Sequence, residues 1–272
     1  MSIHSKMTFL KNTFLPLYRR LIKSGKYGWS GNYPSWIEAL RNSDGYEQDG
    51  ILQKVKDATL KVKKGEAVYE RDSVLFDEVQ YSWPLLSALM WIAAKKQGVL
   101  SVIDFGGSLG STFFQNKKFL EGLQEVRWSV VEQQNFVECG EKEISNSQIR
   151  FFPSISNAIQ ARGLPDLLLI SCTLQYLENP YEFLDEAFAH KIPYLIIDNT
   201  PFNYQPYDRI TVQKIHPAIY EATYPCWFLN YKKVRETVSK RYTIIEEYQN
   251  ELHIHLDGHR IQYSGFLAEL KH

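Results

Sequence analysis

The chain has few cysteines, no excess of charge and no long apolar run, and each shortage argues against a class of protein. Its three cysteines, Cys139, Cys172 and Cys226, are odd in number and far apart, which argues against a disulfide framework and a Cys-x-x-Cys metal site. Basic and acidic residues both number 31, so no net field attracts nucleic acid. No apolar run reaches the roughly 18 residues that span a bilayer. We therefore expect a cytoplasmic protein without a nucleic-acid partner, an integral membrane segment or a metal.

A glycine-rich segment follows a short apolar run near the middle of the chain. Residues 100–103 are apolar, residues 104–111 are small and turn-forming, and apolar side chains at helical spacing come next. This pattern predicts a strand, a tight loop and a helix. Gly106, Gly107 and Gly110 permit positive φ and leave no Cβ between the main chain and a ligand, and a helix start offers unpaired N–H groups. A carboxylate or a ribose oxygen would fit there.

The spacing of these glycines distinguishes two classes of cofactor. A dinucleotide site needs G-x-G-x-x-G, and Ser108 and Ser111 stand at two of its glycine positions. The pattern acid-x-Gly-x-Gly-x-Gly is met by Asp104, Gly106 and Gly110, with Ser108 as the departure at its middle glycine. The spacing therefore favours an adenosyl cofactor linked to methionine over a nicotinamide.

A carboxylate closes the next predicted strand. Glu132 follows the apolar residues 128–131, and a carboxylate at that place can accept hydrogen bonds from both ribose hydroxyls. The alternative interpretation is a glycine-rich turn followed by a solvated surface glutamate.

On these residues the chain resembles the class I S-adenosylmethionine-dependent methyltransferases, from about residue 87 to the C-terminus. Apolar runs at 165–172 and 194–198 are similar to the fourth and fifth strands of that family. Residues 242–246 and 261–268 have no helix-length segment between them, so we expect an antiparallel hairpin, which marks this family. The resemblance implies an α/β fold with a Rossmann-like seven-stranded sheet, helices on both faces, an N-terminal helical cap and an insertion between strands five and six.

A narrower resemblance lies in four motifs at residues 29–36, 69–73, 104–111 and 224–229. They are similar to an uncharacterised bacterial methyltransferase family that is often encoded among surface-polysaccharide genes, and the similarity covers nearly the whole chain. It implies S-adenosyl-L-methionine as cofactor, S-adenosyl-L-homocysteine as product, and a role in polysaccharide biosynthesis.

The order of the segments predicts how the chain is divided. We expect an N-terminal helical cap over residues 1–80 and a methyltransferase domain over 81–272. Residues 199–241 are too long for an ordinary connection, so they should form a lid with helices of its own. Residues 6–24 predict a basic amphipathic helix, which could contact an anionic membrane surface or could join a domain or a second copy of the chain.

The residues expected to hold the cofactor come from the loop, the strand ends and the N-terminal part. Arg71 is included because a guanidinium pairs bidentately with a carboxylate, although it could instead pair with Glu70 or Asp72 at the surface. The expected set is Asp104, Gly106, Gly107, Ser108, Gly110, Glu132, Gln133, Ser171, Cys172 and Arg71.

Methyl transfer from a sulfonium needs two positioned molecules and, for an oxygen or nitrogen acceptor, a group that takes a proton. His216, within residues 199–241, is the first candidate base, and Asp198 at the end of the fifth strand is a rival. Gln175 should border the transferred methyl group. Many small-molecule relatives have a histidine near the position of Gln175, and its absence puts a base on the fourth strand in doubt.

Aromatic residues make up 14% of the chain, with 17 tyrosines and 6 tryptophans, and they gather outside the predicted sheet. Aromatic rings with polar tips suit a wall that packs against a ligand and hydrogen-bonds it, although they could equally form the core of a lid. The expected acceptor site consists of Trp29, Tyr33, Tyr176, Tyr204, Tyr220 and Trp227.

The leading hypothesis is thus a methyltransferase acting on an oxygen or nitrogen of a small-molecule or carbohydrate acceptor. One alternative is a nucleotide-sugar or NAD-dependent oxidoreductase, which Ser108, Ser111 and the terminal hairpin disfavour. The other is a non-catalytic relative that binds the cofactor, favoured only by the missing base.

Overall fold

The computed structural model describes residues 27–43, 48–217 and 219–271. The amphipathic helix expected over residues 6–24, and the membrane or partner contact expected of it, lie outside the described residues.

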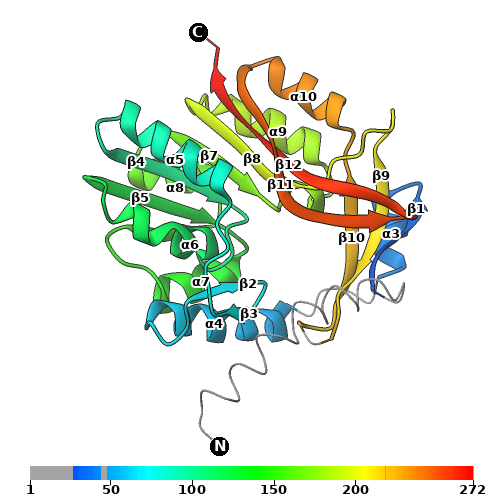
Figure 1. Ribbon diagram of the computed structural model, residues 1–272, viewed down its shortest axis with the longest axis horizontal. Coiled ribbons are helices and arrows are strands. Elements are labelled where there is room, and N and C mark those ends of the chain that lie inside the picture. The colour runs from blue at the N-terminus through cyan, green and yellow to red at the C-terminus, as the bar shows by residue number, and fades with distance from the viewer. Residues whose placement is uncertain (1–26, 44–47, 218, 272) are drawn as a thin grey trace, which may run out of the picture.

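A seven-stranded mixed sheet forms the centre of the protein (Figure 1). Its strand order is β6-β5-β4-β7-β8-β12-β11. The first five run parallel, and β12 is antiparallel to both of its neighbours. The expected sheet and its terminal hairpin are thus confirmed. The strands are β4 (Val99–Phe105), β5 (Glu125–Val131), β6 (Ile149–Phe152), β7 (Leu167–Ser171), β8 (Tyr194–Thr200), β11 (Tyr242–Leu256) and β12 (His259–Leu270).

Helices cover both faces of this sheet, and the residues of β7 show why that strand is apolar throughout. Leu167 and Leu169 join one buried cluster, while Leu168 and Ile170 join the other. Burying each such side chain contributes roughly 1.5–3 kcal/mol, and a strand buried on both faces needs an unbroken apolar run. The first cluster includes residues of α4 (Gln48–Lys63), α5 (Trp83–Lys95), α6 (Ser111–Leu120) and α7 (Gln134–Glu143), and the second of α8 (Ile155–Arg162), α9 (Pro180–Ala189) and α10 (Tyr231–Ser239).

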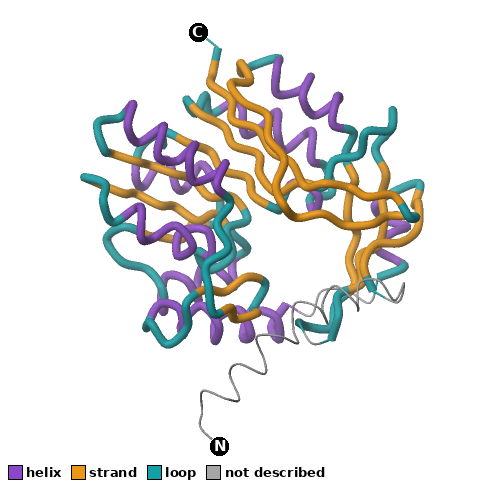
Figure 2. Tube along the Cα trace, in the orientation of Figure 1, coloured by secondary structure: helices purple, strands orange, loops and turns teal. Residues whose placement is uncertain are grey.

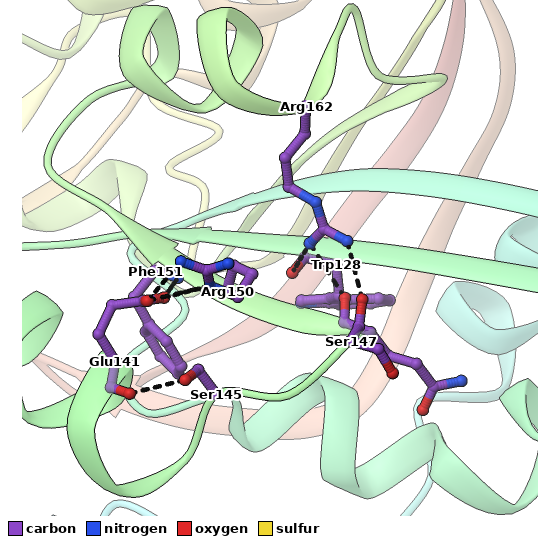
Figure 3. A network of polar contacts seen from close by, with 8 residues as sticks. Trp128, Glu141, Ser145, Ser147, Arg150, Phe151 and Arg162 are labelled. Atoms are coloured by element: carbon purple, nitrogen blue, oxygen red, sulfur yellow. Dashed lines mark hydrogen bonds and ion pairs between the residues drawn. The ribbon is translucent and has the colours of Figure 1, made fainter.

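Charged side chains secure the short edge strand β6 (Figure 3). The Arg162 guanidinium donates to the backbone carbonyls of Trp128, Gln148 and Ser147 at 3.1–3.2 Å. Glu141 on α7 pairs with Arg150 at 2.8 Å and accepts the Phe151 amide at 2.7 Å. These bonds tie β6 and the residues just before it to α7, α8 and β5.

A second, three-stranded antiparallel sheet joins the N-terminal part to the insertion (Figure 2). Its order is β1-β9-β10, and it consists of β1 (Gly28–Tyr33), β9 (Arg209–Lys214) and β10 (Thr223–Phe228). The insertion, residues 199–241, was expected to carry helices of its own. Its described residues form the strands β9 and β10 and one helix, α10. The cap is not purely helical either, because α3 (Trp36–Arg41) and α4 are accompanied by β1 and by a hairpin of β2 (Tyr69–Arg71) and β3 (Val74–Phe76). The division of the chain at residue 80 stays a prediction.

The terminal hairpin reaches beyond the main sheet and contacts the second one (Figure 1). Ile254 and Leu256 on β11 pack in one cluster with Phe228 of β10 and Trp29 of β1. Arg209 of β9 pairs with Asp257 in the hairpin turn at 2.5 Å. The hairpin therefore holds the second sheet beside the end of the main sheet.

Candidate functional site

The glycine loop lies between β4 and α6, at the edge where the carboxyl ends of the parallel strands meet. Gly106 and Gly110 adopt φ of 72° and 90°, and Ser108 adopts a φ of 55°. Ser108 thus takes the left-handed conformation that glycine adopts without strain, at a cost of roughly 1–2 kcal/mol for a residue with a Cβ. The departure from the glycine pattern changes the residue but keeps the positive φ.

Close packing gives a second reason why this loop needs glycine. A Cβ on Gly106 would overlap the side chain of Thr173. A Cβ on Gly107 would lie 2.6 Å from the Asp104 carboxyl carbon, and one on Gly110 would lie 2.5 Å from Ile149 Cδ1. Glycine at these three positions therefore also lets neighbouring side chains pack closely against the loop.

Asp104 lies at the end of β4 with its side chain buried. The Trp128 indole N–H donates a 3.0 Å hydrogen bond to Oδ2 of Asp104. Burial raises the pKa of Asp104 to about 7, and the nearby Glu132 charge acts in the same direction. Asp104 is therefore held in place by the neighbouring strand.

Glu132 directly follows β5 and faces the glycine loop. Its Oε1 accepts the Ser108 amide at 3.2 Å, and its Oε2 accepts the Gln133 amide at 2.8 Å. Burial raises the pKa of Glu132. Because each carboxylate oxygen has two lone pairs, the group can accept further hydroxyl donors in this position.

The segment after β7 turns sharply across the end of the sheet. Cys172 has a φ of 55°, and a short 3₁₀ helix, η1 (Leu174–Tyr176), follows. The Cys172 side chain has exposed surface, yet desolvation by the surrounding protein, followed by the charge of Asp72, raises the pKa of its thiol to about 12. The thiol therefore retains some contact with solvent while it lies close to surrounding protein and to the Asp72 charge.

Gln175, in η1, is completely buried. Its amide Nε2 lies 3.4 Å from the Cys172 sulfur. Its Oε1 has no hydrogen-bond partner within the part of the chain that the structure describes. The amide oxygen is therefore a buried acceptor without a donor in that part of the chain.

Asp198, at the end of β8, is buried and accepts hydrogen bonds from four side chains at 2.9–3.1 Å. Burial raises the pKa of Asp198, and the bonds from Asn250, Ser171 and Tyr248 act against that rise. Its backbone carbonyl also accepts the Cys172 amide at 3.0 Å. A carboxylate so fully engaged holds β7, β8 and the terminal hairpin together.

The second sheet presents a row of polar and aromatic side chains to η1. Trp29, Gln213 and Tyr224 are direct partners across the three strands, so they share one face. The Tyr176 hydroxyl donates a 2.8 Å hydrogen bond to Oε1 of Gln213, and the Tyr176 and Tyr224 rings meet edge to face at 5.3 Å. Tyr220 lies beside this row, with 3.4 Å between its hydroxyl and that of Tyr224. The structure thus brings together three expected residues, Trp29, Tyr176 and Tyr220, and two that sequence reasoning missed.

Other expected acceptor residues lie elsewhere. Tyr33 and Trp227 share the opposite face of the second sheet, packed with α3. The Trp227 indole donates to the Leu177 carbonyl at 3.0 Å. Tyr204 is 62% exposed and packs on Tyr231 of α10. His216, the expected base, comes three residues after Gln213 of the row, just beyond the end of β9, and its ring lies 4.5 Å from that of Tyr27.

The hairpin β2–β3 lies against α6 and carries charges that sequence reasoning weighed only as partners of Arg71. Glu70 is 2% exposed and accepts a hydrogen bond from the Ser111 hydroxyl. Desolvation raises the pKa of Glu70 to about 7. Arg71 donates to Gln80 at 3.2 Å. The signal that could have identified this hairpin was the 69–73 motif, whose middle residues are Glu70, Arg71 and Asp72.

Asp72 is in the two-residue turn at the tip of this hairpin, with a φ of 52°. Its side chain is exposed, yet burial raises its pKa. Besides desolvation, its charge contributes to the raised pKa of both Cys172 and Tyr224. The tip is therefore close to both the segment after β7 and the second sheet.

Within the described residues there is no group of three or more His, Cys, Asp or Glu side chains that could hold a metal ion. Over the same residues, no helix is both long and apolar enough to cross a membrane.

The sequence matches no protein-family model and no curated protein. Among solved structures, the chain is similar to an S-adenosylmethionine-dependent methyltransferase from Methanosarcina mazei, at 13% identity over 70% of this chain and 99% of that one, with a TM-score of 0.49. It is also similar to the glycopeptide N-methyltransferase MtfA complexed with S-adenosyl-L-homocysteine, at 14% identity over 70% and 91%, with a TM-score of 0.47. The strand order and the antiparallel last strand, seen in the chain itself, give it the class I methyltransferase fold.

Proposed function

We propose that this protein is an S-adenosylmethionine-dependent methyltransferase that methylates an oxygen or nitrogen of a small-molecule or carbohydrate acceptor. The observation that carries the proposal is the position of the Glu132 carboxylate beside the glycine loop. It accepts the backbone amides of Ser108 and Gln133. The sheet that positions it has seven strands, of which the last is antiparallel. A desolvated carboxylate there is stabilised by added hydroxyl donors, and the two hydroxyls of a ribose supply them.

In this proposal the cofactor lies along the carboxyl ends of β4, β5 and β7. Glu132 accepts the ribose hydroxyls, and Gln133 borders the adenine. The glycine loop and the segment Ser171–Cys172 flank the methionine portion, and Arg71 pairs with its carboxylate. Bound there, the cofactor supplies an activated methyl group.

The chain contributes positioning and removal of a proton. The chain would hold the acceptor atom in line with the donated methyl group and would take up the proton that this atom releases. Holding the two molecules in line can supply roughly 7–11 kcal/mol. Asp198, with four donors on its carboxylate, serves to position the strand ends, and His216 and Asp72 are the candidates for the proton.

We place the acceptor between η1 and the row Trp29–Gln213–Tyr224. The buried Gln175 oxygen without a partner in the described chain suits a hydroxyl or amine donor. Aromatic faces with polar tips suit a sugar ring, and the surface-polysaccharide setting rests on the sequence resemblance. Action in the cytoplasm is proposed because all three cysteines are free.

Calorimetric titration tests the assignment directly. S-adenosyl-L-homocysteine should bind at micromolar concentrations, and NAD should not bind. Binding of NAD in place of the homocysteine compound would favour the oxidoreductase alternative. Cofactor binding without methyl transfer to any hydroxylated or aminated sugar would favour the non-catalytic one.

A further inference from the structure

Glu70 is a buried carboxylate with only half of its oxygens satisfied. Its side chain is on β2 and is 2% exposed. Oε1 accepts the Ser111 hydroxyl, and the Ser73 amide and the Arg71 charge act to lower the pKa of the carboxyl group, whereas Oε2 has no hydrogen-bond partner among the residues that the structure describes. A carboxylate oxygen withdrawn from water without a partner is costly, so its position calls for a donor that the described chain does not provide.

The place of Glu70 indicates where that donor would come from. Ser111 is the first residue of α6 and directly follows Gly110, the last glycine of the loop. Gln115 of α6 also donates to the Tyr69 hydroxyl at 3.3 Å, so the hairpin is fixed on the first turns of this helix. Glu70 therefore lies beside the loop that we assign to the methionine portion of the cofactor.

A purely structural role accounts for only part of this arrangement. A negative side chain at a helix N-terminus stabilises the helix dipole, and the bond from Ser111 serves that role through Oε1. It leaves Oε2 without a donor. The strongest match for a desolvated carboxylate oxygen is a cationic donor, because charge-assisted hydrogen bonds are about twice as strong as neutral ones.

We propose that Glu70 binds the α-ammonium group of the cofactor's methionine portion. The proposal rests on the proposed function and deepens it. The adjacent Arg71, whose guanidinium donates to Gln80, carries the opposite charge at the end of the same strand. The hairpin belongs to the N-terminal part of the chain, which would make that part a determinant of cofactor recognition.

The test compares two ligands that differ only in the α-amino group. S-adenosyl-L-homocysteine carries it, and 5′-S-(3-carboxypropyl)-5′-thioadenosine lacks it but keeps the carboxylate. By calorimetry the unaltered protein should prefer the first ligand by about tenfold or more, as expected for a hydrogen bond to a charged group. The Glu70→Gln variant, which keeps the shape of the side chain, should lose that preference.

Equal weakening of both ligands by Glu70→Gln would reveal a structural role and overturn the proposal, as would no weakening of either. Glu66→Gln is the matched control, since Glu66 is exposed and close in the chain, and it should keep the full preference. If Glu70→Gln does not fold, Glu70→Asp keeps the charge with a shorter reach and should reduce the preference. An unchanged preference in that variant contradicts the proposal.

If the unaltered protein binds neither ligand, the methyltransferase function itself fails. If it binds both equally, only this inference fails.

Discussion

The Tyr176 hydroxyl donates a 2.8 Å hydrogen bond to Oε1 of Gln213, and this bond links the segment after the fourth parallel strand to the second sheet. Gln213 is 8% exposed, so the bond is largely shielded from water. The insertion is thereby held over the strand end where methyl transfer is proposed to occur.

Replacing Tyr176 with phenylalanine should therefore loosen the second sheet. Loss of one shielded hydrogen bond is expected to lower the free energy of unfolding by about 1 kcal/mol. Amide hydrogen exchange in Arg209–Lys214 should become faster, while binding of S-adenosyl-L-homocysteine stays unchanged. Tyr207→Phe is the control, because Tyr207 is 54% exposed. Unchanged exchange in β9 would show that the bond does not hold the insertion.

Glu132→Gln should weaken binding of S-adenosyl-L-homocysteine by about 1.5–3 kcal/mol, because the hydrogen bonds to the ribose lose their charge assistance. Calorimetry measures the change directly. Glu178→Gln alters an exposed carboxylate and should leave the affinity unchanged. Normal binding by the Glu132 variant would place the cofactor elsewhere.

The main sheet could be predicted because the apolar pattern of its strands is visible in the local sequence. The second sheet could not be predicted, because its formation depends on pairing between distant segments of the chain. β7 is apolar at each of its first four positions, as a strand buried on both faces must be. β9 pairs with its chain neighbour β10, but β1 is short and its partner β9 lies far away in the sequence. No local periodicity shows that Trp29 lies opposite Gln213. The strands of residues 199–241 were therefore missed, and the length of this segment led to the expectation of helices.

The acceptor site was predicted only in part for a similar reason. Trp29 and Tyr33 would share a face of a regular strand, since side chains alternate. A register shift between Ser30 and Tyr33 breaks the alternation and turns Tyr33 toward α3, as β-bulges do. Glu70 was overlooked because its importance depends on burial, which the sequence does not reveal.

Ser108→Gly should stabilise the protein. Ser108 adopts a φ of 55°, which costs a residue with a Cβ roughly 1–2 kcal/mol; the greater freedom of glycine in the unfolded chain offsets part of the gain. We expect a net increase of about 0.5 kcal/mol in urea unfolding. Affinity for S-adenosyl-L-homocysteine should be retained, because it is the backbone amide of residue 108 that donates to Glu132. Ser108→Val should destabilise the protein, and a stabilising valine would contradict the strain argument.

The buried Glu70 carboxylate should make the stability of the cofactor-free protein depend on pH. Burial raises the pKa of Glu70 from 4.5 to about 7, so the folded state binds this proton more tightly than the unfolded state does. The contribution of Glu70 to stability is thus fully present below about pH 4.5 and is lost as the pH rises toward 7.

Glu70→Gln removes the cost of burying an ionised carboxylate, because the amide of glutamine does not ionise. In thermal or urea unfolding without cofactor, the variant should be more stable than the unaltered protein at pH 8, by at most about 3 kcal/mol, and nearly equal to it at pH 4. Asp104, whose pKa burial also raises to about 7, is present in both proteins and cancels in the difference. Saturating S-adenosyl-L-homocysteine should reduce the advantage at pH 8, since it binds the unaltered protein more tightly and so stabilises it more. A stability difference that is the same at both pH values would mean that Glu70 is not the titrating group.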